Sequence, residues 1–252
     1  MSSPLSAVII TKNARPQLGA CMESLRFCDE IVVVDSGSED GTAEFAQNAG
    51  ARVIFQPWLG FGAQKQFAVG QARNDWVICV DADERISSEL RDSIEREMES
   101  PSADVFVMPR RNRFLGRWLQ HGEGYPDWSM RMFRRDKARW SEDTVHEKVV
   151  TANATIKRLK GDLLHESAES LDGYLGKQNA YTSLQAAQMH AAGKETGLLD
   201  LIGSPLIRFF KFYFLRLGFL DGIPGLIHIT IGCMNSFNKH AKLMALNRTA
   251  GR

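Results

Sequence analysis

The sequence predicts an α/β protein with a doubly wound, mostly parallel sheet and a C-terminal helical extension. Short apolar runs, of the kind found in strands buried on both faces, alternate with helix-like segments through the first 84 residues. Three of these runs, at 5–10, 31–34 and 76–80, end in polar side chains. After residue 165 the alternation stops and long helical patterns follow. Strands that alternate with helices form parallel β-α-β units, which gives the fold class.

The expected elements of the first half follow one another closely. The strand at 5–10 leads to a helix from about Arg15 to Leu25, with Pro16 in the first turn, where proline is tolerated. Residues 36–42 have the chemistry of a turn. The other expected elements are a strand at 31–35, a short helix at 42–49, a strand at 51–55, a helix at 62–73 and a strand at 76–80.

Polar side chains follow these strands, at the sheet edge where ligands bind in open parallel sheets. Thr11 and Asp35 end the first two strands, and Asp81 and Asp83 end the strand at 76–80. In an extended chain the i,i+2 spacing of the two aspartates points both carboxylates the same way. A divalent metal that also holds substrate phosphates would relieve their repulsion. The alternative is two solvated acids that begin a turn.

Two other phosphate-binding folds do not fit. Asp35 lies at a suitable distance for a ribose hydroxyl in a dinucleotide-binding domain, but the turn at 11–16 contains no glycine. The glycine-lysine pattern of a P-loop is absent as well. Nucleotide phosphates must therefore be bound in another way, and a metal on Asp81 and Asp83 would bind them.

Three N-terminal segments resemble the nucleotide-sugar-binding half of family 2 glycosyltransferases, which have the GT-A fold. They are residues 6–13 (SAVIITKN), 31–42 (IVVVDSGSEDGT) and 80–84 (VDADE). Residues 125–135 (YPDWSMRMFRR), 145–149 (VHEKV) and 214–222 (FLRLGFLDG) resemble the bacterial subgroup that builds lipopolysaccharide core. The resemblance covers nearly the whole chain.

This resemblance implies a metal-dependent, inverting glycosyltransferase of the hexosyltransferase type. It would use Mg or Mn and move a sugar from a nucleotide-sugar donor to a lipid-linked saccharide such as lipopolysaccharide core. One alternative is a polyprenyl-phosphate glycosyltransferase, whose phosphate acceptor needs no strong base. A sugar nucleotidyltransferase belongs to a different class. It normally has a glycine-rich loop after the first strand, and residues 11–16 lack one. A scaffold without activity would have no reason to keep Asp81 and Asp83.

The resemblance also suggests roles for the residues at the sheet edge. Asp35 and Thr11 would read the base or ribose, while Asp83 would be the better metal ligand and Asp81 would share the metal or bind ribose. Arg131 is the candidate from a basic stretch, because it alternates with two methionines on a probable strand. The expected nucleotide-sugar-binding residues are Thr11, Lys12, Asn13, Asp35, Ser36, Lys65, Asp81 and Arg131, and the expected metal ligands are Asp81, Asp83 and His165.

Inverting transfer also needs a carboxylate that takes the proton of the acceptor hydroxyl. Glu147 is our first candidate for this catalytic residue and Asp143 the second. The run 144–150 is typical of a strand, in which His146 and Glu147 would face opposite sides. A solvated surface acid is the alternative at each position.

The predicted domains are a GT-A domain at 1–168 and a helical extension at 169–252. The first comprises a nucleotide-sugar half at about 1–84 and an acceptor half at about 85–168. Residues 205–220 are aromatic but carry Arg208, Lys211 and Arg216, too many charges for a spanning helix. This composition favours an interfacial helix on anionic lipid. The alternative is a hairpin packed on the domain or on a second subunit of a homo-oligomer.

Composition sets the remaining expectations. The net charge of +1 argues against a nucleic-acid partner. The four cysteines show neither zinc spacing nor a disulfide framework, which suits a reducing compartment. The first apolar run is short and lacks the basic flank of a signal peptide. We therefore expect a cytoplasmic protein, peripheral on the inner face of the bacterial inner membrane.

Overall fold

The computed structural model describes residues 2–141, 147–167 and 170–250, which form two compact units. Unit 1 comprises the described parts of 1–110 and 127–166, and unit 2 comprises those of 111–126 and 167–252. The segment 111–126 therefore belongs with the C-terminal helices, although it lies within the first part of the sequence.

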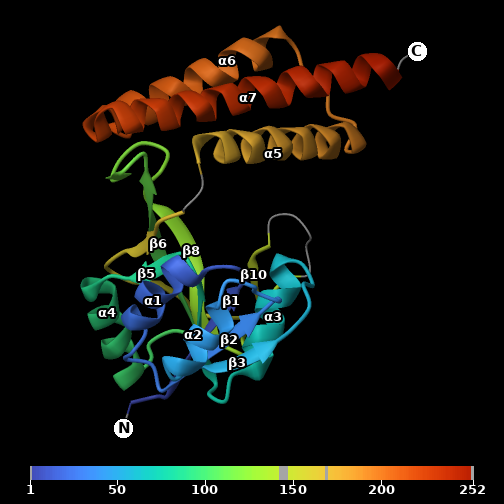
Figure 1. The fold of residues 1–252 in the computed structure, drawn as a ribbon. Helices are drawn as coiled ribbons and strands as arrows, with labels where there is room; N and C mark the ends of the chain where they lie inside the picture. The colour runs from blue at the N-terminus through green and yellow to red at the C-terminus, as the bar shows by residue number, and fades with distance from the viewer. Residues whose placement is uncertain (1, 142–146, 168–169, 251–252) are drawn as a thin grey trace. The chain divides into compact units, whose positions relative to one another are not determined.

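The first half of unit 1 alternates strands and helices as predicted (Figure 1). Its elements are β1 (Leu5–Thr11), α1 (Arg15–Ser24), β2 (Glu30–Asp35), α2 (Thr42–Asn48), β3 (Arg52–Phe55), α3 (Phe61–Gln71) and β4 (Trp76–Asp81). Strands β3, β2, β1 and β4 lie side by side and run parallel. The register places Thr11 beside Asp35 and Ile10 beside Asp81, so the polar strand ends are level at one edge.

The second half extends the same sheet, in the order β3-β2-β1-β4-β8-β6-β12-β5, and β11 pairs parallel with β6 off this path. Its elements are β5 (Glu84–Ile86), α4 (Ser88–Glu99), β6 (Val105–Phe114), β8 (Asp127–Arg134), β9 (Ala138–Trp140), β10 (Val149–Thr151), β11 (Ile156–Arg158) and β12 (Leu163–His165). The end of β6 and the short strand β7 (Arg117–Trp118), which pairs with it, belong to unit 2. Strand β8 is antiparallel to both β4 and β6. The predicted α/β fold, with a doubly wound, mostly parallel sheet and a C-terminal helical extension, is confirmed.

Each face of the sheet has its own hydrophobic core, because successive side chains of a strand point to opposite faces. On one face, Ile9, Val33 and Ile78 pack with buried residues of α1, α2 and α4. On the other face, Val8 and Val77 pack with residues of α3 and β9. The strands are therefore buried on both sides, which explains their continuous apolar sequences.

Unit 2 is built around α5 (Leu171–Ala191), α6 (Leu198–Phe209) and α7 (Gly222–Ala250), with α7 packed against the other two. The predicted aromatic segment 205–220 is not one helix. It continues α6 to Phe209, forms a π-helix at Phe210–Leu215 and ends in a 3-10 turn at Gly218–Asp221. Leu217 adopts a left-handed conformation with φ of 54°, which ends the helix. A break of this kind in a helix cannot be predicted from the pattern of apolar residues.

Two acids, the buried Asp221 and the half-buried Glu123, hold segment 111–126 within unit 2. The Asp221 carboxylate accepts hydrogen bonds from the backbone amides of Gln120 and His121, at 3.0 and 2.8 Å. Glu123 pairs with Arg208, whose Nε lies 3.0 Å from Glu123 Oε2. These contacts explain why a segment distant in sequence folds with the C-terminal helices.

Candidate active site

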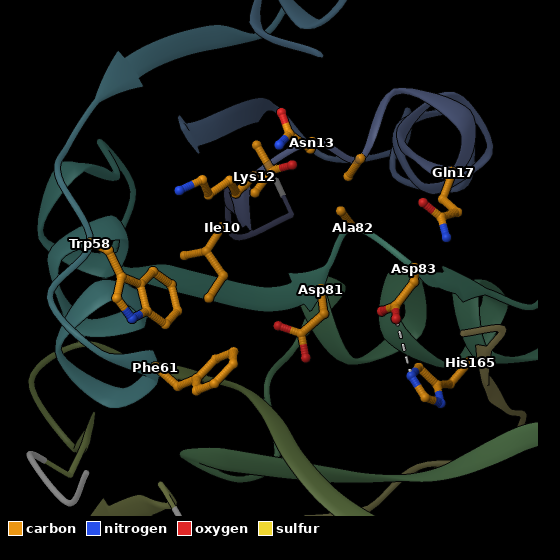
Figure 2. Close-up of a pocket in the computed structure, with 12 residues that line it drawn as sticks. Ile10, Lys12, Asn13, Gln17, Trp58, Phe61, Asp81, Ala82, Asp83 and His165 are labelled. Carbon is orange, nitrogen blue, oxygen red and sulfur yellow. Dashed lines mark ion pairs between the residues drawn. The ribbon is translucent and has the colours of Figure 1, made fainter. Parts of the chain in front are cut away.

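A cavity of about 640 Å³ lies at the carboxyl ends of β1 and β4 in unit 1 (Figure 2). Six of its lining residues were predicted to bind the donor or a metal: Thr11, Lys12, Asn13, Asp81, Asp83 and His165. The other lining residues are Ile10, Ala14, Gln17, Trp58, Phe61 and Ala82. The sequence therefore identified most of the polar residues of the cavity, but neither Gln17 nor the aromatic part.

Asp81, the last residue of β4, lies between two buried cations. Lys65 Nζ is 3.3 Å from Asp81 Oδ2, and Arg131 Nη2 is 3.0 Å from the same oxygen. Burial alone would raise the pKa of Asp81, but the charges of Arg131 and Lys65 outweigh burial and lower that pKa below its usual range. Asp81 is therefore ionised and held in place by two hydrogen-bonded partners.

Glu84 completes this cluster and was not among the predicted site residues. Arg131 Nη2 donates to Glu84 Oε1 at 2.8 Å, and Glu84 Oε2 accepts from the backbone amide of Asp81 at 3.0 Å. Glu84 is completely buried. Burial raises the pKa of Glu84, with the Asp81 charge adding to the rise and Arg131 opposing it. Arg131, only 5% exposed, contacts these acids and is not among the residues that line the cavity.

Asp83 faces the cavity from a turn, not from an extended strand. Because β4 ends at Asp81 and β5 begins at Glu84, the predicted alignment of two carboxylates along one strand is wrong. Asp83 instead pairs with His165, with 3.2 Å between Asp83 Oδ2 and His165 Nε2 (Figure 2). The antiparallel pairing of β12 with β5 brings His165 beside Glu84 and so next to this turn.

Lys65 links Asp81 to Glu147, the predicted base. Lys65 Nζ lies 3.3 Å from Glu147 Oε1, and the Lys65 side chain is only 7% exposed. Glu147 precedes β10, which starts at Val149, so Glu147 is not on the strand that the sequence predicted. Asp143 and the other residues of 142–146 lie outside the described residues.

Asp35 and Ser36 support the loop beside the cavity but do not line it. Asp35 Oδ2 accepts hydrogen bonds from the amides of Gly37 and Ser38, both at 2.9 Å. Ser36 Oγ accepts from Gln64 Nε2 at 3.0 Å. Asn13, which does line the cavity, accepts from the Glu39 amide at 2.9 Å. The carboxylate predicted to read the base or ribose thus shapes the turn at 35–38.

Trp58 and Phe61 form the aromatic part of the cavity that sequence reasoning missed. Their ring centroids are 4.8 Å apart and their planes are nearly perpendicular. Trp58 is 48% exposed and Phe61 is 53% exposed. The sequence does contain a sign of these aromatic residues, because two bulky rings lie close to Gly60, between a predicted strand and a predicted helix.

The chain is similar in sequence to known glycosyltransferases. The sequence model of the family described as Glycosyl transferase family 2 matches residues 6–159. The chain is 35% identical over 247 residues to the lipopolysaccharide core biosynthesis glycosyltransferase LpsC of Rhizobium meliloti (strain 1021), covering 95% of this chain and 92% of LpsC. It is 31% identical over 258 residues to the uncharacterized glycosyltransferase RP128 of Rickettsia prowazekii (strain Madrid E), covering 96% of this chain and 87% of RP128.

Two solved structures have a similar fold. The S. aureus TarS 1-349 structure in complex with UDP-GlcNAc has a TM-score of 0.50 at 16% identity, with 98% of this chain and 92% of that chain covered. The mannosyl-3-phosphoglycerate synthase from Rubrobacter xylanophilus also has a TM-score of 0.50, at 17% identity, with 78% and 77% covered. At these identities the likeness concerns the fold alone.

Proposed function

The chain belongs to glycosyl transferase family 2 and is a glycosyltransferase with the GT-A fold, and we propose that it moves a sugar from a nucleotide-sugar donor to a lipid-linked saccharide of the lipopolysaccharide-core type, with inversion. The observation that carries the proposal is the cavity at the ends of β1 and β4, whose wall holds Asp83 and His165. Its volume is in the range of small-molecule and cofactor sites. The similarity to LpsC over nearly the full length supports the acceptor class.

A divalent metal, Mg or Mn, fits Asp83 and His165. A carboxylate oxygen and an imidazole nitrogen 3.2 Å apart are both common metal ligands. Among the described residues no three His, Cys, Asp or Glu side chains form a metal-binding group, so most ligands would come from the donor diphosphate and water. When bound, the metal would neutralise charge on the leaving diphosphate. Asp81 is already engaged by two cations, and we assign it to positioning Lys65 and Arg131.

Glu147 is the proposed general base. Its carboxylate is held by Lys65, which is itself anchored on Asp81, so the base and the end of β4 are connected through one buried ammonium group. The carboxylate must lie within hydrogen-bond reach of the acceptor hydroxyl, on the sugar face opposite the leaving diphosphate. Asp143 remains the second candidate.

We also propose that unit 2 lies on an anionic membrane surface, at the inner face of the inner membrane. Among the described residues, no single helix is both long and apolar enough to cross a bilayer. The segments Leu198–Leu215 and Gly218–Thr249 meet that criterion only as a pair, with a bend of 74° between them. Large apolar side chains are exposed along the first of these segments, next to Lys211 and Arg216. Apolar side chains with neighbouring bases suit a lipid interface.

A donor screen tests the proposal. The purified chain is incubated with a panel of sugar nucleotides, with and without Mg or Mn, and the released nucleoside diphosphate is measured. We expect metal-dependent hydrolysis of one donor and faster release when a truncated lipopolysaccharide acceptor is added. Glu147→Gln should suppress the acceptor-dependent release. If no sugar nucleotide is consumed under any of these conditions, the proposal is wrong.

A further inference from the structure

The aromatic wall of the cavity has no role in the function proposed so far. Trp58 and Phe61 each leave about half of their surface exposed, although burying a large aromatic side chain is favourable. Both rings line the cavity, and their nearly perpendicular planes form a corner. Exposed apolar surface within a concave site is typical of a ligand-binding surface. A flat apolar ligand group is the natural complement of such rings.

The loop at 56–60, which carries Trp58 and leads into Phe61 at the start of α3, is held by hydrogen bonds from Gln64. Gln64, a fully buried residue of α3, donates from Nε2 to the Gln56 carbonyl at 3.3 Å and to Ser36 Oγ at 3.0 Å. Its Oε1 accepts from the Leu59 amide at 3.3 Å. The loop at 56–60 is thus tied to the end of β2 before any ligand arrives. A surface fixed in advance costs little entropy when it binds.

The cavity also changes in polarity along its length. Figure 2 shows Trp58 and Phe61 beside Ile10, whereas Asp83 and His165 lie at the opposite side with Asp81 between the two groups. A sugar nucleotide has the same distribution, with a flat heterocycle at one end and a charged diphosphate farther along. We propose that Trp58 and Phe61 form the stacking platform for the base of the donor nucleotide, an inference that rests on the proposed function.

This assignment makes the face of the base, not its hydrogen-bonding edge, the main source of affinity. Every nucleobase has a π-face, so stacking tolerates different bases. The carboxylate of Asp35, which the sequence suggested for reading the base or ribose, is occupied by the amides of Gly37 and Ser38. The platform therefore binds both purine and pyrimidine diphosphates, and the choice of sugar donor is made elsewhere in the cavity.

Calorimetric titration of the full chain with UDP and with ADP tests the platform. We expect Trp58→Ala and Phe61→Ala each to raise the Kd of both nucleotides about tenfold or more, because base stacking on an aromatic side chain is worth that much. Trp58→Phe keeps a ring and should stay close to the wild-type affinity. Leu59→Ala is the matched control, since Leu59 is 49% exposed on the same loop but does not line the cavity. Inorganic pyrophosphate, which has no base, should bind all variants equally.

The outcomes separate this inference from the proposed function. Unchanged nucleotide affinity in Trp58→Ala and Phe61→Ala, with transfer activity intact, overturns the platform alone. A change confined to the KM of the saccharide acceptor also overturns it, because the rings would then stack on the acceptor. Weaker pyrophosphate binding in the same variants would show a general distortion of the cavity and contradict the assignment. A wild-type chain that binds no nucleotide and consumes no donor would remove the proposed function and the platform together.

Discussion

At the scale of single residues, Asp81 and Asp83 have different surroundings although they are two positions apart. Asp81 is held by Lys65 and Arg131, and Asp83 faces His165 across 3.2 Å. An acid already paired with two buried cations gains little from a metal. An acid beside an imidazole at the cavity wall can share a metal with it. We therefore expect Asp81 to have a structural role and Asp83 to be the metal ligand.

This division predicts opposite effects for two isosteric substitutions. Asp83→Asn should leave the free energy of unfolding nearly unchanged and lower metal-dependent donor hydrolysis by roughly 100-fold, because a charged ligand is lost. Asp81→Asn should lower the free energy of unfolding by about 3 kcal/mol, because the buried side chains of Lys65 and Arg131 lose a counter-charge. Urea denaturation and the hydrolysis assay measure the two effects. A strongly destabilised Asp83→Asn with wild-type turnover would contradict the division.

At the scale of elements, the start of α3 is packed too closely to accept a side chain at residue 62. A Cβ on Gly62 would lie 2.2 Å from the Ser141 carbonyl oxygen and 3.3 Å from the Glu147 Cβ. This approach lets Lys65, one turn along the helix, reach both Asp81 and Glu147.

Gly62→Ala should therefore displace α3, lowering the free energy of unfolding by about 1–3 kcal/mol through overpacking. Gly70→Ala is the matched control on the same helix. A Cβ there meets nothing within 4 Å, so the higher helix propensity of alanine should stabilise the protein by about 0.5–1 kcal/mol. The test is a comparison of the denaturation midpoints of Gly62→Ala and Gly70→Ala. Equal midpoints would show that α3 is not constrained at Gly62.

In unit 2, α7 contains a histidine that resists protonation. Burial lowers the pKa of His228 to about 4, with the Arg208 charge lowering it further and Asp221 opposing. In the unfolded chain this histidine titrates near 6.5. Between those pH values the unfolded state binds the proton more readily, so His228 disfavours folding increasingly as the pH falls.

The unfolding free energy of the wild type should accordingly decline between pH 6.5 and 4, with a His228 contribution of up to about 3 kcal/mol. His228→Phe retains an aromatic ring beside Phe114 and Tyr174 but cannot take up a proton. The test is the difference in unfolding free energy between wild type and variant across this range. If that difference does not change with pH, the folded and unfolded chains bind the proton equally well at this histidine.

At the scale of the whole molecule, local patterns predicted the nucleotide-binding half well. Strands buried on both faces need continuous apolar runs, so β1, β2 and β4 were found close to their true limits. The position of β8 between β4 and β6 was not predictable, because antiparallel pairing between distant strands leaves no periodic signal. The contact of Arg131 with Asp81 and Glu84 depends on that pairing. The side chains of Trp58 and Phe61 looked like ordinary loop residues until the fold placed them at the cavity.

The exposed apolar side chains of unit 2 are a feature that the sequence indicates only in part. Between residues 198 and 226 many large apolar side chains are exposed, including Leu199 at 88%, Ile207 at 70% and Ile223 at 73%. On α6 and the π-helix they recur every three or four residues, so the helix presents an apolar stripe. Composition suggested an interfacial segment, but only the structure shows that packing within unit 2 leaves these side chains uncovered.

We predict that the full chain co-sediments with vesicles containing anionic lipid, and that high salt weakens this binding without abolishing it. The residual binding is apolar, so Leu199→Glu combined with Ile207→Glu should reduce it. Lys211→Glu combined with Arg216→Glu should remove the salt-sensitive part, lowering the affinity roughly tenfold or more, because each base near an anionic surface is worth about 1 kcal/mol. Ile156→Glu is the control, since Ile156 is 49% exposed on β11 of unit 1. A chain that stays in the supernatant and forms a defined oligomer, which Ile207→Glu dissociates, would identify the stripe as a subunit interface, because charge placed in an apolar contact between copies breaks that contact.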